Sequence, residues 1–255
     1  MQNDIAFANL VTGFLLVTTR VGAFFTFIPL PGSRAFLAMP KATLTVSVAF
    51  MLFRFWPTDG IVSSFSGLIV AIASEATLGL VAGTGLALVI EAMQLTGQFI
   101  ALQAGFSYAS TIDPNSEADS GILLIICQLL TSLIIFASGL DREILAALAN
   151  SFERIPVGTY HLTNAGALGI LAVGSSMFQI GLRLAMPVIA ILLIADISLA
   201  LLGKIEQHLQ LSSLMFPLKT LAALAILALV IPSLVRLIEQ WLTSGWRAVQ
   251  QAGGF

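Results

Sequence analysis

Long apolar runs, separated by short polar or proline-containing links, follow one another along this 255-residue chain. The runs are continuous rather than alternating, and several reach the roughly 20 residues that an α-helix needs to cross a bilayer. The pattern therefore predicts an all-α integral membrane protein, with one membrane domain over residues 1–255 and no separate soluble domain. The predicted helical runs are residues 5–30, 42–53, 61–92, 121–140, 165–202 and 220–231.

Two of these runs do not have the length of a simple span. Residues 42–53 would make a helix of about 18 Å, which is shorter than a bilayer core of about 30 Å. Residues 165–202 are too long for one span and contain Arg183, Pro187 and Asp196. Because proline removes a helical hydrogen bond, the second run predicts two helical stretches that are kinked or turned near Pro187.

Polar residues divide the second half of the chain further. Residues 144–164 predict an amphipathic helix followed by a loop outside the membrane, and residues 203–219 predict a polar link before the last apolar run. Within residues 61–92, Gly79 and Gly83 form a pair of small residues four apart, a spacing that lets two helices approach closely.

Residues 97–121 change from apolar to polar and acidic, and we expect the preceding helix to end within them. Gln103 interrupts the apolar positions, and Gly105 weakens the helix. The stretch Asp113-Pro114-Asn115-Ser116 predicts a turn, because proline fixes φ and Asp and Asn side chains cap turns. In a bilayer, such irregular backbone is tolerated only at the water interface or inside protein or a water-filled cavity.

The composition agrees with a membrane protein. Hydrophobic residues make up 58% of the chain and charged residues only 9%, and the mean hydropathy is +0.99. The N-terminus lacks the basic residues of a cleaved signal peptide, so we expect the first helix to stay attached. A single cysteine, Cys127, excludes an internal disulfide and a cysteine-based metal cluster.

The charges are unevenly distributed. Between Arg54 and Arg142 the chain has no lysine or arginine but seven acidic residues. This acidic stretch disfavours binding of nucleic acid.

Five ionisable residues fall within or beside apolar runs, and such residues are costly in a bilayer. They are Arg20, Glu75, Glu91, Arg183 and Asp196. One interpretation makes the three acids a proton or cation relay, as in a transporter. The other makes all five structural: the acids pair with the two arginines or with partner subunits during assembly, or these residues lie nearer the membrane interface.

The chain has no pattern typical of catalysis or of cofactor binding. His161 and His208 lie 47 residues apart without nearby carboxylates, which argues against a metal site. No phosphate-binding loop or nucleophile motif is complete. We therefore expect a protein that is not an enzyme and needs no cofactor.

The sequence GQFIALQAGFSYASTIDPNS at residues 97–116 resembles the FliR family of flagellar export-gate subunits and its type III secretion counterparts. Shorter motifs in the same order extend the resemblance over nearly the whole chain. They are Arg20-Val21-Gly22, Pro40-Lys41, Met186-Pro187-Val188 before Asp196, and Phe216-Pro217-Leu218-Lys219 before the last apolar run.

The resemblance implies long, kinked helical hairpins within a helical, ring-like export gate. A part resembling the gate's P subunit would cover about residues 1–164, and a part resembling its Q subunit about residues 165–255. The implied partners are the P and Q subunits, the export switch protein, the large export-gate ring protein, unfolded protein substrates in transit and membrane lipid. The implied location is the flagellar basal body in the bacterial inner membrane.

The family's plug loop corresponds to about residues 106–116, which would close the channel at rest. These residues are Phe106, Ser107, Tyr108, Ala109, Ser110, Thr111, Ile112, Asp113, Pro114, Asn115 and Ser116. Phe216, Pro217 and Lys219 fall in the polar loop expected before the last span. The alternative is an ion-coupled secondary transporter, for which broken helices and buried acids are also expected.

Overall fold

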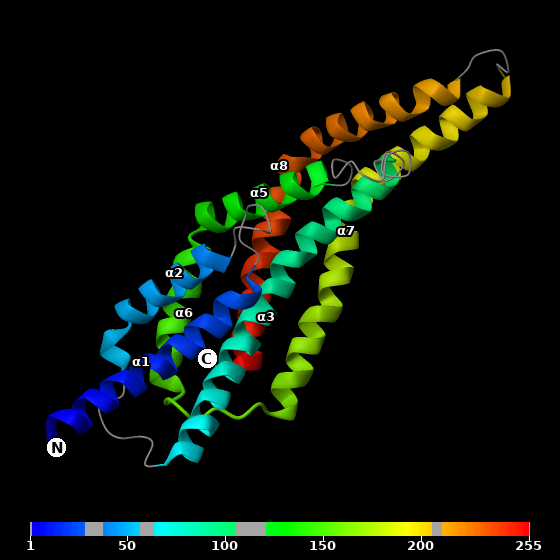
Figure 1. Cartoon of the computed structure of the whole chain (residues 1–255). Helices are drawn as coiled ribbons and strands as arrows, with labels where there is room; N and C mark the ends of the chain where they lie inside the picture. Colours follow the sequence, from blue (N-terminus) through cyan, green and yellow to red (C-terminus); the bar gives the residue numbers. More distant parts are fainter. Residues whose placement is uncertain (1, 29–37, 57–63, 106–120, 206–210, 255) are drawn as a thin grey trace. The chain divides into compact units, whose positions relative to one another are not determined.

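The computed structural model describes residues 2–28, 38–56, 64–105, 121–205 and 211–254. The regular structure in these ranges is helical (Figure 1), which confirms the all-α prediction. The elements are α1 (Gln2–Phe27), α2 (Ala38–Met51), the short 3-10 helix η2 (Phe53–Phe55), α3 (Phe65–Ala104), α5 (Gly121–Ser138), α6 (Leu140–Arg154), α7 (Asn164–Ile205) and α8 (Leu211–Gly253).

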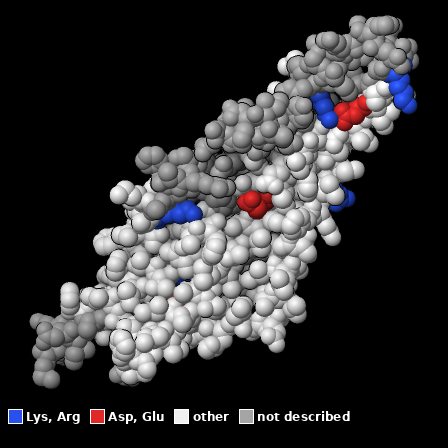
Figure 2. All heavy atoms as spheres, turned by 45° about the vertical axis from the view of Figure 1, so that its right-hand side comes forward, with Lys and Arg blue, Asp and Glu red and all other residues white. Residues whose placement is uncertain are grey.

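Several helices have the length and composition of membrane spans. Among the described residues, Asn9–Phe27, Phe65–Ala104 and Asn164–Ser198 are long and apolar enough to cross a membrane. The number rises to five if each of two bent helix pairs counts as one span. The face drawn in Figure 2 carries few charged side chains. These features agree with a protein embedded in a membrane.

Residues 165–202 form one helix, α7, that continues through Pro187, so the predicted alternative of a turn is wrong, whereas the alternative of a kink near Pro187 stays a prediction. The missing N–H of a proline removes one hydrogen bond, to the carbonyl four residues earlier, which here is that of Arg183. Ala185, Val188 and Leu192 around this point are buried with 0% exposure. Packing of this face therefore holds the helix together across the proline.

The polar loop predicted over residues 203–219 is also largely wrong. α7 continues to Ile205 and α8 begins at Leu211, so that Phe216, Pro217 and Lys219 belong to a helix. Serine and lysine side chains are compatible with a helix, and a helical backbone satisfies its own hydrogen bonds in apolar surroundings. Polarity alone was therefore a poor signal for a loop here.

The chain divides into two compact units, each assembled from segments far apart in the sequence. The first comprises residues 1–89, 139–174 and 243–255, and the second comprises residues 90–138 and 175–242. These units follow packing and have different boundaries from the P-like and Q-like parts. The division into P-like and Q-like parts was inferred from the resemblance to other subunits, and it stays a prediction.

In the first unit, α3 lies directly against α1. A Cβ atom at Gly79 would overlap the carbonyl oxygen of Arg20, and one at Gly83 would overlap that of Phe24. The close helix approach predicted from these two glycines is confirmed. Two residues after Gly83 on α3, a Cβ at Gly85 would lie 2.6 Å from Val249 of α8.

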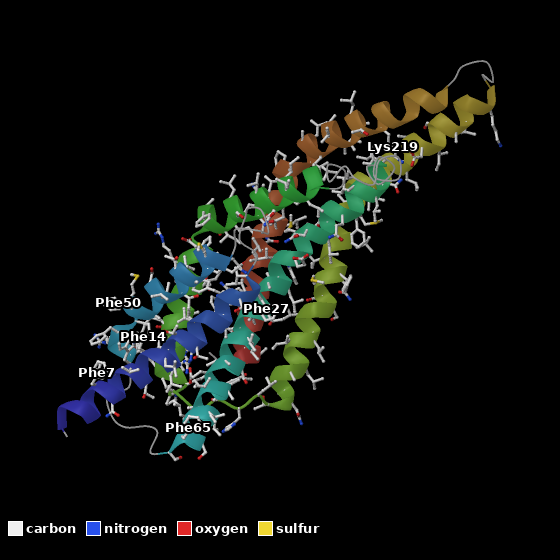
Figure 3. The ribbon with its side chains drawn as sticks, viewed as in Figure 1. Phe7, Phe14, Phe27, Phe50, Phe65 and Lys219 are labelled. Atoms are coloured by element: carbon white, nitrogen blue, oxygen red, sulfur yellow. The ribbon has the colours of Figure 1, made fainter. Side chains whose placement is uncertain are left out.

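The α1–α2 hairpin in the same unit is closed by an aromatic cluster. The Trp56 ring lies 5.1 Å from that of Phe14 and 4.9 Å from that of Phe53, measured between ring centroids. Trp56 also donates its indole N–H to the carbonyl of Ala49 at 3.1 Å. Figure 3 shows Phe14 on α1 and Phe50 on α2 at this hairpin.

The second unit contains the end of α3, α5, most of α7 and the first part of α8. Its core includes Ile100, Ala104, Leu123, Leu192 and Leu227. The end of α3 also bonds directly to α7, because Thr96 donates its hydroxyl to the Gly181 carbonyl at 3.2 Å. This packing holds the last turns of α3 within the second unit.

Candidate functional site

The first group of predicted site residues is a buried ion pair inside the first unit. Arg20 on α1 and Glu75 on α3 have side chains that are 1% and 0% exposed. Arg20 Nε donates to Glu75 Oε2, and Nη2 donates to Oε1 at 3.0 Å. This two-point geometry is the strongest arrangement available to an arginine and a carboxylate.

Residues of α6 and of the following loop complete the surroundings of Arg20. Its Nη1 donates to Ser151 Oγ at 3.2 Å, and its Nη2 donates to the carbonyl of Ile155 at 3.1 Å. The guanidinium carbon lies 4.0 Å from the ring centroid of Phe152, a cation–π contact. The sequence analysis missed these three residues, because only the tertiary fold brings α6 against α1.

Glu75 has a second partner besides the arginine. The backbone N–H of Gly158 donates to Glu75 Oε1 at 2.7 Å. Gly158 has a φ of +80°, a backbone conformation that favours glycine. The neighbouring Ser74 hydroxyl donates to the Tyr160 carbonyl at 2.8 Å, so two consecutive residues of α3 hold this loop in place.

The arrangement around Glu75 bears on the relay hypothesis. A relay carboxylate must exchange protons, whereas both oxygens of Glu75 accept hydrogen bonds from an arginine or a backbone amide. Both oxygens are therefore already engaged in hydrogen bonds within the first unit. The geometry favours a structural role that joins α1, α3, α6 and the loop after α6.

The second group is a polar cluster in the second unit. Asp196 Oδ2 on α7 accepts hydrogen bonds from Gln103 Nε2 on α3 at 3.0 Å and from Lys219 Nζ on α8 at 2.8 Å. The Lys219 and Asp196 side chains are 20% and 32% exposed. The pairing of Asp196 with a lysine rather than an arginine was not foreseen, because residues 203–219 were predicted to form a loop.

The other two charged candidates lie apart from these pairs in the sequence. Glu91 on α3 is half-buried, and Arg183 on α7 is exposed on this chain. Of the five ionisable candidates, Arg20 and Glu75 are buried, Glu91 and Asp196 are half-buried, and Arg183 is exposed. Glu91 shares its helix with Gln94, which is half-buried, and Gln98, which is exposed.

The predicted plug, residues 106–116, lies outside the described residues, but the helix that leads to it is well defined. α3 passes through Gln98 and Gln103 and ends at Ala104, so its end does fall within residues 97–121 as predicted. Gly105 follows with a φ of +85°, and its N–H donates to the Leu102 carbonyl at 3.2 Å. A left-handed glycine of this kind commonly ends a helix.

Small-molecule chemistry has little support among the described residues. No group of three or more His, Cys, Asp or Glu in that part of the chain could hold a metal ion. A cleft of about 310 Å³ in the first unit lies beside Tyr160, His161 and the end of α8, and its lining carries no Lys, Arg, Asp or Glu. Burial raises the pKa of Tyr160, so its phenol stays un-ionised at neutral pH.

A comparison with known families decides which kind of protein this is. The model of "Bacterial export proteins, family 1" matches residues 11–245, which is nearly the whole chain. The chain belongs to this family.

Curated relatives in several bacteria agree with the assignment, and each carries the name "Flagellar biosynthetic protein FliR". The relative in Buchnera aphidicola (strain APS) is 24% identical over 93% of this chain and 92% of its own length. That of Escherichia coli K12 is 26% identical over 86% and 84%, and that of Caulobacter vibrioides is 29% identical over 89% and 92%. The similarity extends along the chains rather than over one motif.

Proposed function

We propose that this chain is a membrane subunit of the bacterial flagellar export apparatus. The observation that carries the proposal is the family match over residues 11–245, together with full-length relatives named as flagellar biosynthetic proteins. The apolar helices support a location in a membrane, and the flagellar relatives support the inner membrane at the flagellar basal body as that location. Its role is non-enzymatic.

The proposal extends to the assembly around the chain. The P and Q subunits pack with it to form the export channel, with the switch protein and the large ring protein as further partners. Unfolded protein substrates cross this channel. Exposed apolar side chains along α7, such as Leu171, Phe178 and Ile194 at 68%, 58% and 63%, supply surface that lipid or a partner helix would cover.

Residues 106–116 are the proposed plug that closes the channel at rest and moves aside for substrate. They follow directly after α3, whose end is anchored to α7 through Gln103 and Thr96. The proposal is supported by this anchored helix end and by the change from apolar to polar and acidic residues after it.

The transporter alternative is less well supported. Among the acids that would form its relay, Glu75 is engaged by Arg20 and Asp196 by Lys219.

Co-expression with the neighbouring P and Q subunits, followed by native mass measurement, tests the assembly proposal. The expected result is a stable complex that contains all three kinds of subunit, with much less of this chain recovered when it is expressed alone. A stable solitary monomer or homodimer that transports ions after reconstitution would contradict the proposal and favour the permease.

A further inference from the structure

A single carboxylate oxygen links three helices of the second unit. Asp196 Oδ2 on α7 accepts hydrogen bonds from Gln103 Nε2 at the end of α3 and from Lys219 Nζ near the start of α8. Figure 3 labels Lys219. We call these three residues the polar tie.

The polar tie lies at one end of the apolar core of this unit. On each helix it stands about one turn from a core residue, namely Ile100 on α3, Leu192 on α7 and Ala223 on α8. The tie therefore joins the three helices at one level, directly beside the apolar contacts that they share.

The end of α7 and the start of α8 run antiparallel to each other (Figure 1), so one turn back along α7 corresponds to one turn forward along α8. One turn from the tie, this geometry places Leu192 opposite Ala223, and both residues belong to the core. A second turn places Val188 opposite Leu227, which are core residues as well. The ion pair and the apolar contacts thus agree on one register of the two helices.

Little in the apolar surfaces themselves distinguishes this register from one shifted by a turn. α8 consists of Ala, Leu, Ile and Val from Leu221 to Ile231, and α7 is apolar from Leu184 to Ala195. Because hydrophobic attraction is non-directional, a shifted α8 would still bring apolar side chains together. The same shift would move Lys219 about 5.4 Å along the helix axis from Asp196 and break the ion pair.

We propose that the polar tie determines the register of α8 against α7. A polar contact within an apolar helix interface can select one register with little gain in stability, because the other registers leave its groups without partners. The Lys219 and Asp196 side chains are 20% and 32% exposed, which agrees with a small contribution to stability. The inference goes beyond the proposed function, and it holds whether water, lipid or a partner subunit lies outside the tie.

Disulfide formation between pairs of introduced cysteines reports the register. The single cysteine of the chain, Cys127, is first replaced by alanine. Leu192→Cys/Ala223→Cys then reports the register of the structure, and Leu192→Cys/Leu227→Cys reports a shift of α8 by one turn. Each pair is oxidised in native membranes with a membrane-permeant oxidant, in the full chain with and without Lys219→Met.

We expect the first pair to cross-link about tenfold faster or more than the second, because a disulfide requires Cα atoms within about 7 Å of each other. Lys219→Met should lower this ratio about fivefold, the factor expected for the loss of one partly exposed ion pair. Lys219→Arg keeps the cation and should restore the ratio. Lys204→Met is the matched control, because it removes an exposed lysine of α7 that is not part of the tie, and it should leave the ratio unchanged.

An unchanged ratio in Lys219→Met would overturn the proposal, because apolar packing alone would then set the register. Loss of both cross-links would overturn it as well, since the ion pair would then hold the two helices together rather than select their register. If Lys219→Met does not accumulate, Lys219→Gln takes its place with the same expected result, because glutamine is shorter than lysine and uncharged.

Discussion

Arg20 and Glu75 face each other in a two-point ion pair whose side chains are 1% and 0% exposed. Breaking such a pair from one side leaves a buried charge without compensation, which typically costs about 3–5 kcal/mol. We therefore expect Glu75→Gln to lower the free energy of unfolding by about that amount and to reduce the quantity of assembled gate. Denaturant titration of the purified protein and co-purification of the partner subunits measure the two effects.

A matched double variant distinguishes a structural role of the Arg20–Glu75 pair from a role in proton transfer. In Arg20→Met/Glu75→Met both charges disappear, and much of the stability lost in Glu75→Gln should return, because apolar replacements of buried pairs are often neutral. A Glu75→Gln variant that assembles in normal amounts but loses proton-coupled transport would contradict this account and favour the relay.

The contact between α3 and α1 leads to a packing prediction. A Cβ at Gly83 would overlap the backbone of Phe24, so Gly83→Ala should force the two helices apart and cost about 1–3 kcal/mol. Gly174→Ala is the control, because the nearest atom to its Cβ is Leu88 Cδ1 at 3.7 Å, an ordinary contact.

Thermal unfolding of the two alanine variants checks this prediction. Gly174→Ala should be neutral or slightly stabilising, since alanine is the better helix former by about 1 kcal/mol. Equal destabilisation by both substitutions would show that the close helix approach is not the cause.

The Lys219–Asp196 pair should behave differently from the buried pair. Because both side chains are partly exposed, the pair is expected to contribute about 1 kcal/mol or less. Lys219→Met should therefore change the free energy of unfolding far less than Glu75→Gln does, measured in the same titration. A comparable loss in both variants would mean that the Asp196 carboxylate is as thoroughly removed from water as Glu75.

Much of the fold could be predicted from the pattern of residues along the chain. The apolar runs predicted the helices, the spacing of Gly79 and Gly83 predicted the contact with another helix, and Gly105 marked the end of α3. These features depend on local chemistry that one stretch of sequence contains. The family resemblance was correct as well, because its motifs extend along nearly the whole chain.

The partners of the charged residues could not be predicted from the sequence in the same way. Arg20 meets Ser151 and Phe152 only because α6 packs against α1, and no local pattern encodes that meeting. Pro187 and residues 203–219 misled the prediction for a related reason. Tertiary packing carries α7 through its proline, and the backbone of α8 is helical from Leu211, against the local preference of the sequence.

The central claim is that this chain forms part of a protein-export channel that residues 106–116 close at rest. Deleting residues 110–116 removes most of the proposed plug, and ion or dye leakage across the membrane is then measured in cells that produce the complete apparatus. Co-purification of the partner subunits verifies assembly in the same cells. The account predicts clear leakage with assembly preserved, and unchanged permeability in a fully assembled apparatus would contradict it.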